Sequence, residues 1–156
     1  MPGSDAMTPE QRRYVVGETV ISVVINTVIS VGFAWLMFGG ASSISMRAIT
    51  LDSIPQSFMI TLMSVLVPGF LTLRRLQVGV LAPLPGLPPR WSLPVRAVCA
   101  ALIAIVAGLA VHAALGTGWV ADVGFSTLLA VKIVYGATLA AVVTPFMLRY
   151  AMRRDI

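Results

Sequence analysis

The sequence predicts an all-α integral membrane protein, in which four helices form a bundle across a bilayer. Apolar residues make up 58% of the 156 residues and charged residues only 11%, whereas a soluble domain has about 25% charged residues. The apolar residues occur in long runs without the strict alternation of a membrane β-barrel. This composition excludes a disordered chain and a water-soluble enzyme.

Four segments have the length of about 20 mainly apolar residues that a membrane-spanning helix needs. They cover residues 15–38, 54–73, 93–115 and 124–150, within a membrane domain of residues 15–150. Pro55 and Pro94 fall in the predicted first turns of the second and third spans, where a missing N–H costs little. The apolar stretch of the first span is longer than that of a signal peptide, which has about 7–15 residues, so we expect this span to be retained.

The connection formed by residues 76–92 is rich in proline and still apolar. Pro83, Pro85, Pro88 and Pro89 exclude a regular helix throughout and favour extended, polyproline-like backbone. Two interpretations remain open. The connection is either a stiff link at the membrane interface or a docking strip for a neighbouring subunit.

Arginine placement predicts the orientation, because cytoplasmic connections carry the excess of basic residues. One side has Arg47 alone. The other side, which includes the tails 1–14 and 151–156, has Arg12, Arg13, Arg74, Arg75, Arg90, Arg96, Arg149, Arg153 and Arg154. We therefore expect a bacterial inner-membrane protein with both termini in the cytoplasm, and its positive charge reflects topology rather than a nucleic-acid partner.

Spans two and four end alike, which raises the hypothesis of two tandem helical hairpins. Pro68 precedes Arg74 and Arg75, and Pro145 precedes Arg149. Parallel repeats of this kind occur in transporters. The alternative is that prolines are common in membrane helices and that basic exits follow from topology alone.

Polar residues recur at helical spacing on one face of each of the first two spans. Because lipid does not drive helices together, such faces indicate where helices meet. Asn26 lies near mid-membrane and needs a hydrogen-bond partner, and we expect Glu18 to pair with Arg12 and Arg13. The two stripes are Glu18, Ser22, Asn26 and Ser30, and Ser57, Thr61, Ser64, Pro68 and Thr72.

Small residues recur every four positions in the last two spans. They let helix backbones approach closely, so they are candidate packing positions within the bundle. In span three they are Ala100, Ala104 and Gly108, followed by His112, and in span four they are Gly136 and Ala140, between Lys132 and Thr144.

Lys132 is the one strongly ionisable residue well inside a predicted span, where an unpaired charge is costly. With His112, Asp52, Asp122 and Tyr135 it makes a candidate polar site in the outer third of the bundle, and Asn26 is a further intramembrane polar candidate. One interpretation is a proton-linked or anion-binding site. The other is a lysine that reaches toward the headgroups or pairs with Asp52 or Asp122 and so anchors its helix.

The sequence contains no P-loop, dinucleotide fingerprint or metal-ligand spacing, and one histidine supplies only one haem ligand. We therefore expect no enzyme and no cofactor. The main hypothesis is an accessory or structural subunit that packs against a larger membrane complex or against copies of itself in the bilayer. The alternative is a small oligomeric proton-linked or anion transporter with a site around Lys132.

Overall fold

The computed structural model describes residues 7–116 and 122–154, and its architecture is the predicted four-helix type. The helices are α1 (Pro9–Phe38), α2 (Met46–Gln77), α3 (Leu93–Gly116) and α4 (Phe125–Ala151). Two very short strands, β1 (Leu84–Pro85) and β2 (Arg153–Arg154), pair in parallel. All four helices are long and apolar enough to span a membrane, so the chain is a multi-pass membrane protein.

Two helices begin earlier than the hydrophobic spans predict, because polar residues cap them. Thr8 and Gln11 form a reciprocal capping box that starts α1 at Pro9. The Ser45 side chain accepts from the amide of Ala48 and starts α2 at Met46. Pro55 therefore lies inside α2 rather than in its opening turn, and the prediction about Pro55 was wrong. Hydropathy reports the apolar part of a helix, whereas capping residues decide where the helix begins.

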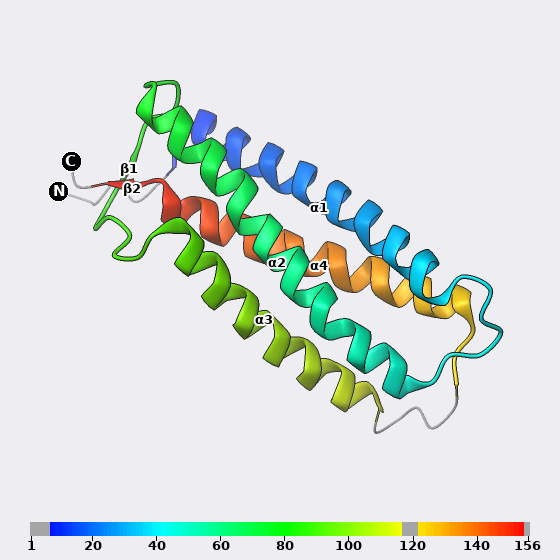
Figure 1. Cartoon of the computed structure of the whole chain (residues 1–156). Coiled ribbons are helices and arrows are strands. Elements are labelled where there is room, and N and C mark those ends of the chain that lie inside the picture. The colour runs from blue at the N-terminus through cyan, green and yellow to red at the C-terminus, as the bar shows by residue number, and fades with distance from the viewer. Residues whose placement is uncertain (1–6, 117–121, 155–156) are drawn as a thin grey trace.

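Among the described residues, α2 and α3 are the one pair of consecutive helices that packs extensively. α1 packs mainly against α4, and α2 packs against both α3 and α4 (Figure 1). α1 touches α2 only lightly, and among the described residues α3 and α4 hardly touch. The packing therefore interleaves the two halves of the chain, and the hypothesis of two tandem hairpins stays a prediction.

The start of α1 and the end of α4 lie at the same end of the bundle as the proline-rich connection, residues 76–92 (Figure 1). The connection folds back across this end, where the amide of Leu84 donates to the carbonyl of Met152 over 2.9 Å. Leu81 and Leu84 are buried there against Val15 and Leu148. The connection is therefore a packed part of the fold.

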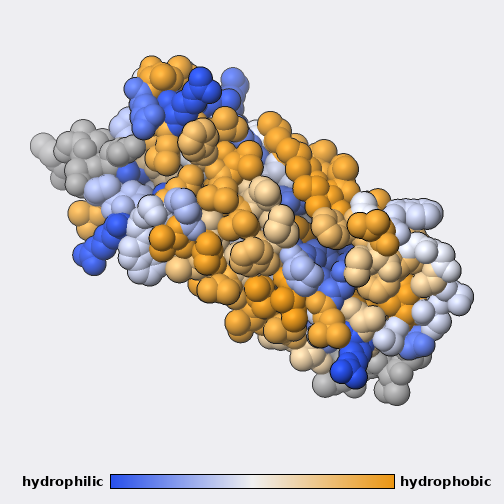
Figure 2. Space-filling model, viewed as in Figure 1, coloured by the Kyte–Doolittle hydropathy of each residue, from blue (hydrophilic) through white to orange (hydrophobic). Residues whose placement is uncertain are grey.

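Apolar side chains cover most of the flank of the bundle seen in Figure 2, and hydrophilic ones gather mainly near its ends. Large apolar side chains are exposed along the helices, for example Val28 and Leu36 on α1, Ile103 on α3 and Phe146 on α4. An apolar flank of this extent suits a hydrocarbon environment. The interior, in contrast, contains many polar side chains, and these form the candidate site.

Candidate functional site

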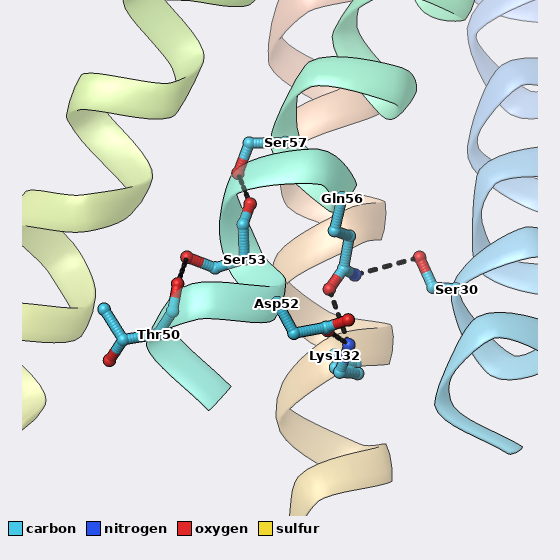
Figure 3. Close-up of polar contacts among 7 residues, drawn as sticks. All are labelled: Ser30, Thr50, Asp52, Ser53, Gln56, Ser57 and Lys132. Atoms are coloured by element: carbon cyan, nitrogen blue, oxygen red, sulfur yellow. Dashed lines mark hydrogen bonds and ion pairs between the residues drawn. The ribbon is translucent and has the colours of Figure 1, made fainter. Parts of the chain in front are cut away.

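The candidate site is centred on Lys132 and joins three helices (Figure 3). Lys132 of α4 forms an ion pair with Asp52 of α2, and its Nζ also donates to Gln56 Oε1 over 3.0 Å. Gln56 Nε2 in turn donates to Ser30 Oγ of α1 over 3.2 Å. We call these four residues the Lys132 network. The network fastens α2 to both α1 and α4.

Glycine on α4 makes room for the network. Gly136 lies one turn beyond Lys132 on the same face, and a Cβ there would stand 2.7 Å from Ser30 Oγ and 3.2 Å from a methyl group of Ile60. The absent side chain lets α1 and α2 approach α4 closely. The small-residue face of α4, at Gly136, therefore packs against the polar face of α1, at Ser30.

Burial makes this ion pair energetically important. The side chain of Lys132 is 4% exposed and that of Asp52 is 9% exposed. The Lys132 side chain is thus directed into the bundle and does not reach toward headgroups, and the ring of Phe38 lies 5.5 Å from its Nζ. An isolated charge at such a position would be costly, so each partner neutralises the other.

His112 and Tyr135 form a separate pair on the side of the bundle where α3 and α4 diverge. Their rings meet edge to face with centroids 5.6 Å apart. His112 Nδ1 lies 2.8 Å from the carbonyl of Gly108, and the Tyr135 hydroxyl lies 2.7 Å from Ser57 Oγ. Neither side chain contacts Lys132 through a described hydrogen bond, so the predicted site divides into two groups.

Asp122 and Asn26 lie apart from both groups. Asp122 accepts from Ser43 over 2.6 Å in an exposed pair. Asn26 donates to Ser64 of α2 over 2.8 Å, and Ser22 next to it also contacts Ser64 and Thr144. The polar stripes of α1 and α2 therefore meet in the interior, as their spacing predicts.

Two buried polar atoms at or near the contact between Asn26 and Ser64 lack a hydrogen-bond partner among the described residues. They are Asn26 Oδ1 and Thr61 Oγ1. Buried polar atoms normally have partners, and a buried water often supplies the missing one. The interior thus has spare hydrogen-bonding capacity between the Lys132 network and the opposite end of the bundle.

At the end of the bundle near residues 76–92, Glu18 pairs with Arg75 of α2, with a 3.6 Å separation between Oε1 and a guanidinium nitrogen. The prediction that Glu18 pairs with Arg12 and Arg13 was wrong. Both are exposed on α1, whereas the Glu18 face of α1 is turned toward its neighbours. Tyr14 on α1 and Thr72 on α2 share a hydrogen bond of 2.8 Å nearby.

The small-residue stripes of α3 and α4 both pack inside the bundle. Ala100 and Gly108 of α3 face α2, with Ala100 in a cluster with Val65 and a Cβ at Gly108 directed at Ser57. Ala104 and Ala140 are also buried on the same faces of α3 and α4. These stripes therefore form the internal contacts of the bundle.

Sequence reasoning missed Gln56, which connects Lys132 to Ser30. Its signal was the spacing from Asp52, because residues four apart lie on one helix face. In the described part of the chain no cluster of three or more histidine, cysteine, aspartate or glutamate residues is arranged to hold a metal ion. Comparison with known proteins finds no matching family model, no similar curated protein and no similar solved structure.

Proposed function

We propose that this chain is an accessory or structural subunit of the bacterial inner membrane, with both termini in the cytoplasm, and that it docks through the connection 76–92. The observation that carries the proposal is the division of apolar side chains within this connection. Leu81 and Leu84 are buried as anchors, whereas Val80 and Leu87 are 76% and 77% exposed.

The connection is held in one shape, which favours a docking role. Gln11 Nε2 donates to the carbonyl of Ala82 over 2.9 Å, and β1 pairs with β2 at the end of α4. A segment that is already ordered loses little conformational entropy when a partner binds. Exposed Trp91 and the neighbouring Arg90 add an aromatic and a bidentate donor, which are the residue types enriched in protein interfaces.

The test compares co-purification after gentle detergent extraction. We expect a V80S/L87S double variant to lose the partner, or the second copy of the chain, that the wild type retains. Leu51→Ser is the matched control, because Leu51 is 58% exposed on α2 near the opposite end of the bundle. A photo-crosslinking residue at position 87 should form one adduct of defined mass. A lone wild-type species without such an adduct would contradict the proposal.

A second candidate function is a small oligomeric proton-linked or anion transporter. The observation that favours it is a buried ion pair within a chain of polar side chains, because ionisable groups inside a membrane often mark ion pathways. Asn26 Oδ1 and Thr61 Oγ1, which have no hydrogen-bond partner in the described part of the chain, extend the polar interior past the Lys132 network.

Flux measurements separate the two candidates. In proteoliposomes with a pH-sensitive dye, a transporter should lose proton or anion flux in the K132M/D52L double variant, which removes both charges of the pair and leaves neither buried alone. A subunit with no transport role should show the flux of empty vesicles before and after the substitution. Co-purification of the partner should then be unaffected by K132M/D52L and abolished only by the V80S/L87S variant.

A further inference from the structure

The strongest unassigned feature is a groove between α3 and α4, on the side where these helices diverge. Its volume is about 620 Å³, which lies in the range typical of small-molecule sites. Apolar residues such as Val111, Val134 and Val142 line it, together with the polar residues His112, Tyr135 and Thr138. Because Val134 and Val142 are exposed on the flank of a membrane-spanning helix, the groove opens toward lipid.

The hydrogen bond of His112 determines what the ring can offer. Its Nδ1 lies 2.8 Å from the carbonyl of Gly108, and a carbonyl only accepts, so Nδ1 carries the proton and donates. In the neutral ring Nε2 is then an acceptor. His112 is 5% exposed, so an acceptor at this position has little access to water.

The hydrogen bond of Tyr135 likewise determines what its hydroxyl group can offer. Ser57 Oγ lies 2.6 Å from the carbonyl of Ser53, which can only accept, so the single hydroxyl hydrogen of Ser57 is donated there. Ser57 Oγ must therefore accept from the Tyr135 hydroxyl, which lies 2.7 Å away. The proton of Tyr135 is thus engaged inside the bundle, and its oxygen keeps only acceptor capacity.

Gly108 is required for this arrangement. A Cβ at this position would collide with the Tyr135 hydroxyl and would stand 2.8 Å from Ser57 Oγ. The missing side chain lets Tyr135 reach past α3 to α2, which leaves His112 and Tyr135 side by side at the groove. Thr138 supplies a further hydroxyl among the described residues that line the groove. This hydroxyl can both donate and accept, so it does not discriminate between ligands.

We propose that the α3–α4 groove binds a membrane-soluble molecule that has an apolar body and a hydroxyl group. The hydroxyl donates its hydrogen to the acceptors presented by His112 and Tyr135, while the apolar body lies along Val134 and Val142. A ketone or an ether of the same shape lacks the donor and leaves these acceptors unpaired. This inference does not depend on the proposed docking role of residues 76–92.

The test uses two photoreactive probes, a diazirine-bearing hexadecanol and its methyl ether, with the full chain in lipid nanodiscs. We expect the alcohol to label residues 107–112 and 130–142 about fivefold more than the ether does, as one hydrogen bond in this environment predicts. Excess unlabelled hexadecanol should compete with this labelling, and hexadecyl methyl ether should compete about fivefold less well.

Three variants complete the test. His112→Phe and Tyr135→Phe should each lower alcohol labelling toward the level of the ether, and Thr138→Val should leave the preference intact. Size-exclusion profiles report whether each variant is folded, and the wild-type comparison between alcohol and ether stands even if a variant is not. Equal labelling by both probes would mean that the groove accepts acyl chains without selection. Crosslinks to a second copy of the chain through this groove would likewise overturn the proposal.

Discussion

The buried ion pair between Lys132 and Asp52 gives the sharpest prediction about stability. We consider three variants: Lys132→Met, Asp52→Leu and the double variant. Methionine and leucine replace the charged side chains with apolar ones of broadly similar size. Each single variant leaves one charge buried without its counter-ion, and the double variant removes both charges.

The structure predicts unequal effects for the two single variants. When one partner of a buried pair is removed, the loss of stability is about 3–5 kcal/mol. In Asp52→Leu, Lys132 still donates to Gln56 over 3.0 Å, so we expect stability to fall by about 3 kcal/mol. In Lys132→Met, Asp52 has no other hydrogen-bond partner among the described residues, so we expect about 5 kcal/mol. The double variant should lie within about 1 kcal/mol of the wild type or be more stable.

The assay is equilibrium unfolding in mixed micelles, followed by far-ultraviolet circular dichroism as the denaturing detergent is increased. A thermodynamic cycle over the four proteins gives the coupling energy of the pair. The reasoning would be refuted if the double variant lost as much stability as the sum of the two single variants. Additive losses would mean that the two charges do not stabilise each other.

Two further predictions concern helix packing and the connection 76–92. Gly136→Ala places a Cβ against Ser30 and should cost about 1–3 kcal/mol by overpacking. Gly32→Ala, where no atom lies within 4 Å of the new Cβ, should be neutral or stabilising, and the same unfolding assay checks both. Gln11→Ala removes the hydrogen bond to the carbonyl of Ala82 and should increase hydrogen exchange and proteolysis within residues 76–92. Unchanged exchange there would show that Gln11 does not hold the connection.

The sequence predicted the helices better than it predicted their partners. Hydropathy located four spans because a bilayer demands long apolar runs. Periodicity also placed Asn26 and Ser64 on faces that meet, since residues four apart lie on one side of a helix. Capping by Thr8 and Ser45 moved the helix starts outward, which an apolar-run argument does not register.

The candidate site was harder to predict because it depends on which helices touch. Lys132 was marked by its position in an apolar run, but the choice between Asp52 and Asp122 required the α2–α4 contact. Gln56 carried no signal of its own until Asp52 was located one turn before it. His112 and Tyr135 were grouped with Lys132 by depth in the membrane. The structure separates them from Lys132 because His112 lies on α3 and Tyr135 is turned toward α3 from α4.

Both proposals require a chain that spans the membrane, and the docking proposal also requires both termini in the cytoplasm. The decisive measurement is cysteine labelling with a membrane-impermeant reagent in a chain that carries Cys99→Ser. Ser42, between α1 and α2, and Ser92, just before α3, are both exposed. The connection between α1 and α2 and the start of α3 lie at opposite ends of the bundle (Figure 1). We expect Ser42→Cys to react from the periplasm of intact cells and Ser92→Cys to react only after the inner membrane is opened. The reverse pattern, or recovery of the folded protein in the aqueous fraction, would contradict the account.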